Sequence, residues 1–264
     1  MFEKLCKFAV CFVAVFCLTD GASRKYLSFY LDSAVFILIV FTIVSASFIT
    51  KCKPDDIKCL KQSTKNAIPV FADGIDAYGV EPLDPLFIKS LDASQGSLKF
   101  IINNATVIGL RNCEAQKVQM DTVNSKIIFK LLCSVKLVGD YILKGSVLFV
   151  PLEGNGKLHV DLNSAVFNVI VDIVTKTSGE GKKFWQIKTW QYNVDFKDKS
   201  NVVFENLLNE NEVLGRAARE VIANNGNDII KEIGLPFIKH CLTRVVKNVN
   251  HFFRATTVED LSIQ

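Results

Sequence analysis

The residues of this sequence that could carry chemistry are few, and they form no recognisable catalytic pattern. The chain has only three histidines, and it lacks the Gly-x-Ser-x-Gly nucleophile motif, the zinc-protease helix motif and a phosphate-binding loop. His159 alternates with Asp161 on the polar face of a predicted strand, where a surface pair is a simpler interpretation than a catalytic dyad. His240 and Cys241 are neighbours on a predicted helix and point about 100° apart, so they cannot act together. His251 lies near a helix end. We therefore predict no catalytic residue and no enzyme.

The cysteines favour disulfide bonds over metal binding. Cys52 and Cys59 are not at a zinc-ligand spacing, and no second pair of cysteines or histidines completes four ligands. A disulfide between them would close a small loop at the start of a helix. We predict no metal and no cofactor. Cys113, Cys133 and Cys241 are an odd set, so at least one is unpaired or is bonded to another chain. Cys133 and Cys241 fall in apolar patterns that are typical of small buried residues.

The first 47 residues indicate a leader that precedes the folded domain. A basic start, an apolar run from Phe8 to Leu18 and small residues at 21–23 are typical of a secretory signal. This run is too short to span a bilayer. A second apolar run, Ala34 to Phe48, also ends in small residues that suit cleavage. We predict a secreted, extracellular protein, and a membrane anchor over residues 26–48 is the alternative.

Residues 48–264 predict one domain, because no linker rich in proline, glycine and serine divides them. This part carries 27 basic and 24 acidic residues. Such a balance does not fit a polybasic nucleic-acid-binding protein. Five lysines gather between Lys51 and Lys65. They indicate either a solvated helix face or a transient contact with an anionic membrane or a receptor. The oligomeric state is left open.

Helical signals occur at the start of this domain. Pro54, followed by two aspartates, predicts a helix that runs to about Asp73 and stops at Gly74. Pro69 should kink or divide the helix. Residues 79–90 contain two prolines and predict an extended connector. The apolar face of the helix consists of Ile57, Leu60, Ile68 and Phe71.

The middle of the domain, residues 97–204, alternates apolar and polar residues with a period of two. This pattern predicts antiparallel strands with one apolar face. The longest alternation, residues 126–137, would extend roughly 40 Å, and strands of that length curve or twist. Turns are expected where glycines cluster, at 139–140, 154–156 and 178–181.

The final element is a long amphipathic helix. Residues 211–253 repeat apolar side chains on one face and would extend roughly 65 Å if they were straight. Gly234 and Pro236 should bend the helix, and residues 224–227 could break it. Such a helix fits a domain of this size only if a long curved sheet covers its apolar face. We therefore predict an α+β fold in which a strongly curved antiparallel sheet wraps the C-terminal helix around an elongated hydrophobic tunnel.

Three ordered motifs resemble the family of insect juvenile-hormone-binding and takeout proteins, and the resemblance covers residues 51–264. The first motif is Cys52 to Lys61 followed by Gly79-Val80-Glu81-Pro82-Leu83-Asp84-Pro85-Leu86. The second is residues 145–156, and the third is Phe204-Glu205-Asn206-Leu207-Leu208-Asn209. The resemblance implies a tubular lipid-binding fold, secretion, a Cys52–Cys59 disulfide and a tunnel for a terpenoid or a fatty acid.

A second disulfide is usual in the haemolymph carriers of this family. None of the three remaining cysteines matches its position, which favours the takeout-like branch. If the helix fills the inner sheet face incompletely, we expect apolar and aromatic side chains to line the ligand space, with a phenolic hydrogen bond from Tyr141. The predicted lining residues are Phe129, Leu131, Val135, Tyr141, Phe149, Phe167, Trp185, Ile233 and Phe237.

Two functional hypotheses follow. The first is a secreted carrier that transports a small hydrophobic ligand, and the second is a non-catalytic interaction protein, membrane-associated or receptor-facing, with a packed interior. The triplet Asn104-Ala105-Thr106 is a glycosylation sequon, which fits secretion.

Overall fold

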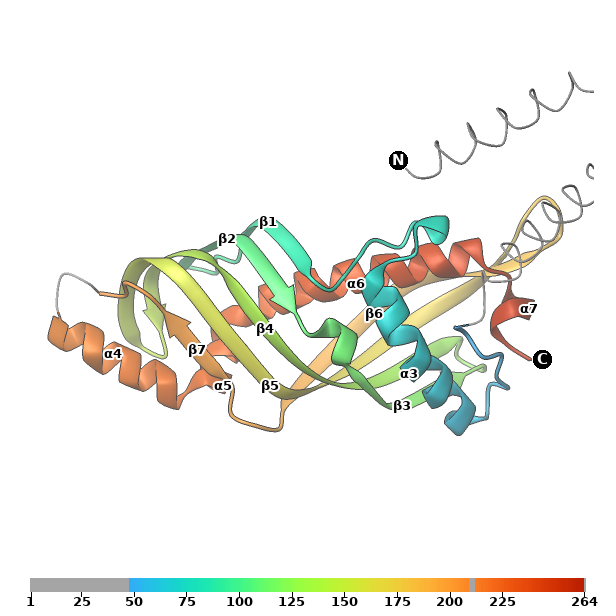
Figure 1. Cartoon of the computed structure of the whole chain (residues 1–264), viewed down its shortest axis with the longest axis horizontal. Coiled ribbons are helices and arrows are strands. Elements are labelled where there is room, and N and C mark those ends of the chain that lie inside the picture. Colours follow the sequence, from blue (N-terminus) through green and yellow to red (C-terminus); the bar gives the residue numbers. More distant parts are fainter. Residues whose placement is uncertain (1–47, 209–211, 264) are drawn as a thin grey trace, which may run out of the picture. The chain divides into compact units, whose positions relative to one another are not determined.

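The structure is a computed structural model and describes residues 48–208 and 212–263. The predicted leader, residues 1–47, lies outside the described residues. The fold class predicted from the sequence is confirmed, because one long antiparallel sheet curves around a C-terminal helix (Figure 1). The sheet does not close, and β1 and β6 are the two ends of its main path.

Seven strands form the described sheet in the order β1-β2-β4-β5-β6, with β3 also paired to β4 and β7 to β5. All of these pairs are antiparallel. The two central strands have 22 and 28 residues, and they would extend roughly 75 and 95 Å if they were straight. Strands of this length bend, and the register shifts between Cys133 and Val135 mark one irregularity. The strands are β1 (Leu86–Asp92), β2 (Lys99–Ile108), β3 (Glu114–Asp121), β4 (Lys126–Val147), β5 (Val150–Thr177), β6 (Lys183–Phe196) and β7 (Asn201–Phe204).

Two of the predicted turns are wrong, because residues 139–140 and 154–156 lie inside β4 and β5. The β4–β5 hairpin turns instead at Leu148 and Phe149, where φ is positive. The glycines are needed for close backbone approach. A Cβ on Gly154 would lie 2.8 Å from the carbonyl oxygen of Asn206, and one on Gly156 would lie 2.6 Å from that of Glu205. The predicted turn at 178–181 does connect β5 to β6.

The C-terminal helix is divided and does not run unbroken over residues 211–253. Its parts are α4 (Glu212–Asn224), α5 (Gly226–Ile229), the π-helical turn η4 (Ile230–Gly234) and α6 (Leu235–Ala255), followed by α7 (Val258–Leu261). The break occurs within residues 224–227, as anticipated. There the Asn227 side chain accepts a hydrogen bond from the Ser200 N–H and donates one to the Asp198 carbonyl. These two hydrogen bonds hold the start of α5 against the segment that precedes β7. Helix α4 packs against β7.

The N-terminal helix α3 (Ile57–Asp73) begins at Asp56, whose carboxylate accepts a hydrogen bond from the Cys59 N–H. Pro69 lies inside α3 without dividing it. After α3, the chain passes through a short 3₁₀ turn, η2 (Asp76–Tyr78), to β1. The predicted extended connector is therefore partly wrong. From Leu86 onward the chain is a strand that pairs with β2 and buries Leu86 and Ile88.

Candidate functional site

A cavity of about 380 Å³ lies between the inner face of the sheet, α3 and the C-terminal helix. Its lining on the C-terminal helix extends from Ile229 to Phe253, which is about 36 Å of helix. The lining is almost wholly apolar. Among the described residues that line it, none is Asp, Glu, Lys, Arg or His, and the hydroxyl groups come only from Thr50, Ser63 and Thr64.

Seven of the nine residues predicted to line a tunnel do line this cavity. They come from three strands and from the C-terminal helix, because alternate residues of each strand point to the same face of the sheet, here the face toward the cavity. These residues are Phe129 and Leu131 and Val135 of β4, Phe167 of β5, Trp185 of β6, Ile233 of η4 and Phe237 of α6.

Tyr141 and Phe149 do not line the cavity, so their assignment to a tunnel is corrected. Tyr141 is buried, and its hydroxyl donates to the carbonyl oxygen of Glu205 at 2.6 Å instead of facing a ligand. Burial raises the pKa of Tyr141 to about 12. Phe149 lies in the β4–β5 turn with its side chain fully exposed, because the turn places it beyond the paired strands.

Tyr141 packs where the second sequence motif, residues 145–156, meets the third, residues 204–209. Its ring packs against Phe204 with centroids 4.8 Å apart. Next to it, the Glu205 N–H donates to the Lys157 carbonyl and the Leu208 N–H to the Glu153 carbonyl. The glycine-containing strand of the second motif and the segment after β7 in the third motif are therefore one packed unit.

Helix α3 is the part of the site that the sequence interpretation missed. Its apolar face was predicted, and Leu60, Ile68 and Phe71 on that face line the cavity. Ser63 also faces the cavity, and its hydroxyl donates to the Thr50 carbonyl and accepts from the Thr50 N–H. The sequence interpretation gave the apolar face of α3 no packing partner. That unassigned face was the signal that could have placed α3 against the cavity.

Two disulfides support the α3 side of the cavity. Cys52 is bonded to Cys59 at the start of α3, and Cys113 is bonded to Cys133 across β3 and β4. Cys133 is buried, as its apolar pattern predicted, and its pairing, which the sequence left open, is with Cys113. The β3–β4 register pairs Glu114 with Leu132, which brings Cys113 opposite Cys133. Both cysteines line the cavity, and the argument for the takeout-like branch from a missing second disulfide no longer holds.

Cys241 is the free cysteine of the described residues and also lines the cavity. Burial raises the pKa of its thiol to about 12, which keeps it protonated. We expect iodoacetamide to alkylate Cys241 at pH 8.5 at least about 100-fold more slowly than an ordinary thiol, since the thiolate is the nucleophile. Peptide mapping by mass spectrometry measures this rate. The same cysteine should react at an ordinary rate after unfolding in guanidinium, and fast alkylation of the native protein would contradict its burial.

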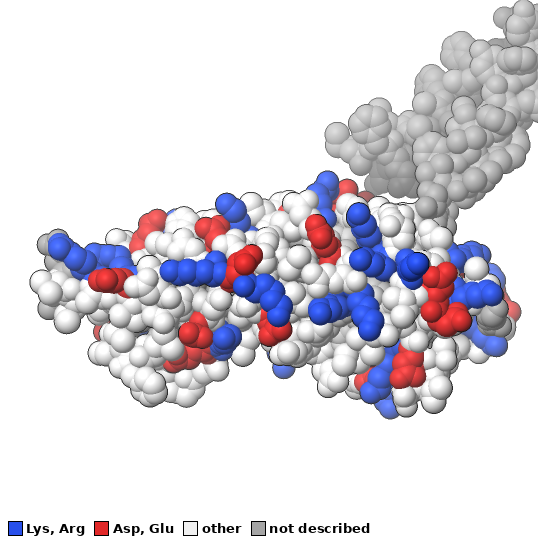
Figure 2. All heavy atoms as spheres, turned by 90° about the horizontal axis from the view of Figure 1, so that it is seen from below, with Lys and Arg blue, Asp and Glu red and all other residues white. Residues whose placement is uncertain are grey.

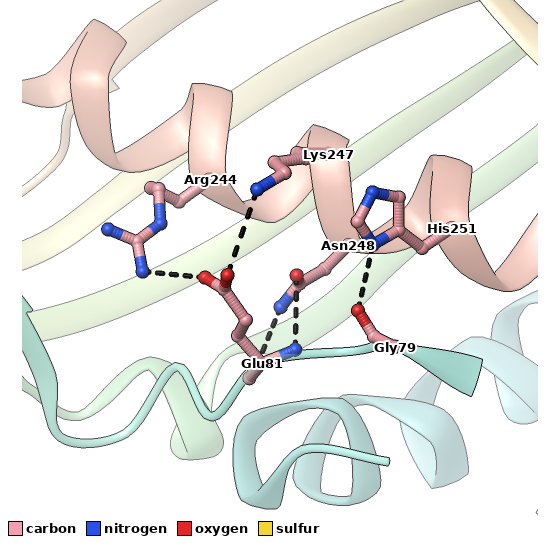
Figure 3. Close-up of polar contacts among 6 residues, drawn as sticks. All are labelled: Gly79, Glu81, Arg244, Lys247, Asn248 and His251. Atoms are coloured by element: carbon pink, nitrogen blue, oxygen red, sulfur yellow. Dashed lines mark hydrogen bonds and ion pairs between the residues drawn. The ribbon is translucent and has the colours of Figure 1, made fainter. Parts of the chain in front are cut away.

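A set of polar contacts fastens the connector after α3 to α6 (Figure 3). The buried Asn248 accepts a hydrogen bond from the Glu81 N–H and donates one to the Glu81 carbonyl. The Glu81 carboxylate pairs with Arg244 at 2.7 Å and lies 3.7 Å from Lys247. The hydrogen bond and charge of Arg244 hold the pKa of Glu81 below its ordinary value. His251 Nδ1 donates to the Gly79 carbonyl at 2.8 Å.

These contacts explain the first motif in physical terms. Gly79 has φ of +65°, a left-handed conformation that favours glycine. Asp84 lies further along the motif, and its carboxylate accepts hydrogen bonds from the N–H groups of Gly109 and Arg111. Leu83, between the two anchored points, lines the cavity. The motif therefore fixes the wall that joins α3 to the sheet.

Removing the buried amide should destabilise the domain measurably. Asn248→Ala leaves the Glu81 N–H and carbonyl without partners, and we expect the free energy of unfolding to fall by about 2 kcal/mol. Denaturant unfolding followed by circular dichroism measures the change. Asn66→Ala, at an exposed position on α3, is the matched control and should change stability by less than about 0.5 kcal/mol. Equal effects of the two substitutions would contradict the role of Asn248.

Strand β5 also carries His159 and Asp161, which lie outside the cavity lining. His159 pairs with Glu205 at 3.0 Å and not with Asp161, which lies 3.5 Å from Lys136. Within residues 48–208 and 212–263, no group of three or more His, Cys, Asp or Glu residues could hold a metal ion. No helix of this described part of the chain has the length and apolar character needed to cross a membrane.

Comparisons with known proteins agree with this architecture. The solved structure of Takeout 1 from Epiphyas postvittana superposes with a TM-score of 0.78 and 22% sequence identity, covering 82% of this chain and 100% of that one. The juvenile hormone-binding protein of Manduca sexta is 29% identical over 96 residues, which span 35% of this chain and 42% of that protein. The family described as haemolymph juvenile hormone binding protein matches residues 34–262. This match extends over most of the sequence, and the chain therefore belongs to the haemolymph juvenile hormone binding protein family.

Proposed function

We propose that the protein is a carrier that binds a small hydrophobic molecule in the cavity beneath the curved sheet. The observation that carries the proposal is the cavity itself, about 380 Å³ in volume and lined by apolar side chains from α3, the sheet and α6. Burial of apolar ligand surface contributes about 25 cal/mol per Å². A ligand with a few hundred Å² of apolar surface would therefore bind without any charged contact.

The lining restricts the chemistry of the ligand. An ionised group buried without a partner costs several kcal/mol, and the described lining residues offer neither a cation nor an anion. A neutral lipid fits better than a fatty-acid carboxylate. A single ester, epoxide or alcohol oxygen would be accommodated near the hydroxyl of Thr64, which is among the three hydroxyl-bearing residues of the wall. The name of the Manduca sexta relative supports a ligand of the juvenile hormone type.

The remaining properties belong to the same proposal. The carrier acts without catalysis, and it is secreted, in keeping with the signal-like leader and the two disulfides. Asn104 is exposed on β2, where an attached glycan would point away from the cavity lining. The alternative, an interaction protein with a packed interior, is less well supported because the interior is hollow.

The proposal is tested by identifying what the purified protein holds. The protein is expressed in insect cells and purified, and native mass spectrometry and lipid extraction are applied to it. We expect a neutral apolar molecule in a ratio of one to one. A protein that is empty and that also fails to take up a fluorescent terpenoid or fatty-alcohol probe would overturn the carrier function.

A further inference from the structure

Helix α3 has two faces of opposite character. Its inner face lines the cavity, whereas Lys58, Lys61 and Lys65 are exposed and follow the i, i+3, i+7 spacing of one helix face. None of these three lysines forms an ion pair with a described residue. Ile57 lies beside them on the first turn and is 42% exposed. Helix α3 therefore presents a row of three exposed lysines, with one exposed apolar side chain beside it.

The net charge of the domain is concentrated in this segment. Residues 51–65 contain five lysines and two aspartates, whereas the rest of residues 48–264 contains 22 basic and 22 acidic residues. Figure 2 shows basic and acidic side chains mixed over one face of the molecule. Lysine–carboxylate pairs such as Lys144–Glu153 and Lys157–Asp140 account for part of this mixing. The segment at the start of α3 therefore carries net positive charge on an otherwise balanced domain.

We propose that α3 docks on an anionic lipid surface through Lys58, Lys61, Lys65 and Ile57, which we call the α3 basic face. The inference rests on the proposed carrier function, since a lipid carrier must take up or release its ligand at membranes. Each lysine near an anionic bilayer contributes about a fivefold gain in partitioning. Three lysines then give roughly 100-fold, which is weak enough to be reversible.

A lipid surface fits the α3 basic face better than a protein partner does. Protein interfaces are enriched in arginine and aromatic residues and depleted in lysine. The exposed positions of α3 are Ile57, the three lysines, Gln62, Asn66 and Asp73, and none of them is arginine or an aromatic residue. Flexible lysines bind mobile headgroups as point charges and need no fixed geometry. Docking would place an apolar ligand in the membrane beside the helix that closes the cavity.

The test compares two triple variants in vesicle co-sedimentation. K58Q/K61Q/K65Q removes the α3 basic face, and K89Q/K199Q/K239Q removes the same charge from exposed lysines on β1, before β7 and on α6. Both variants differ from the wild type only at the three substituted lysines. With phosphatidylcholine vesicles containing 30 mol% phosphatidylserine, we expect the first variant to lose roughly 100-fold in partitioning. The control should keep most of its binding.

Two further measurements separate this inference from the carrier function. Raising the salt concentration to about 0.5 M should release the wild type from anionic vesicles, because exposed charges are screened. Affinity for a soluble fluorescent lipid probe should be unchanged in both variants, since the three lysines do not line the cavity. Membrane docking would be overturned if the two variants lost vesicle partitioning equally, or if the wild type bound pure phosphatidylcholine vesicles as well as anionic ones. Binding to an acidic protein but not to anionic vesicles would overturn it too. Loss of probe uptake with intact vesicle binding would instead overturn the carrier function.

Discussion

Replacing Val160 by tryptophan should remove most of the ligand affinity while the domain stays folded. Val160 lies on β5, pairs with Leu137 and Val202 on the neighbouring strands, and lines the cavity. An indole there would fill space that a ligand needs and would displace about 100 Å² of its apolar contact. At about 25 cal/mol per Å², this is about 2.5 kcal/mol, or a loss of roughly 70-fold in affinity. Titration with a fluorescent apolar probe measures it.

The matched control is Val138→Trp on the adjacent strand. Val138 pairs with His159, is 45% exposed and lies on the outer face of the same part of the sheet. The control should bind the probe as the wild type does, and thermal unfolding should show both variants within about 1 kcal/mol of the wild type. Equal affinities of Val160→Trp and the wild type would place the ligand outside this cavity. Equal losses in both variants would indicate a general effect of tryptophan on the sheet.

The architecture could be predicted from the sequence because two periodicities are long. The period-two pattern of residues 126–137 is part of β4, and the apolar stripe that includes Ile233 and Phe237 is the face of the helix that lines the cavity. The interior positions of both elements follow directly from these periods. The same reasoning failed at 139–140 and 154–156, because glycine marks a turn and a close backbone crossing equally well.

The site was less predictable where contacts join segments that are distant in the sequence. That α3 covers the cavity depends on how the connector is fastened to Asn248, 167 residues from Glu81. The bond between Cys113 and Cys133 depends on the β3–β4 register, which alternation alone does not fix. Tyr141 has a polar group that suits a ligand, and only the position of the Glu205 carbonyl shows that the hydroxyl is already used.

A carboxylic acid should bind far more weakly than its methyl ester at neutral pH, and the difference should disappear on acidification. The described cavity lining offers no charged partner, so the acid must enter in its neutral form. With an ordinary carboxyl pKa near 4.3, the neutral fraction at pH 7.3 is about one in 1,000, which corresponds to about 4 kcal/mol. Hexadecanoic acid should therefore bind about 1,000-fold more weakly than methyl hexadecanoate, as measured by displacement of a fluorescent probe.

The sign of the pH dependence follows from proton uptake. Because the bound acid is neutral and the free acid is ionised, the affinity of the acid should rise about tenfold for each unit that the pH falls, until the pH reaches its pKa. The methyl ester has no titratable group, so any change of its affinity with pH measures titration of the protein itself. Arg244 lowers the pKa of Glu81, so the contacts between the connector and α6 should persist over the window from pH 7.3 to about 5.5. A free acid that binds tightly at pH 7.3 without this slope would require a cation at the ligand, and the neutral-ligand hypothesis would then be wrong.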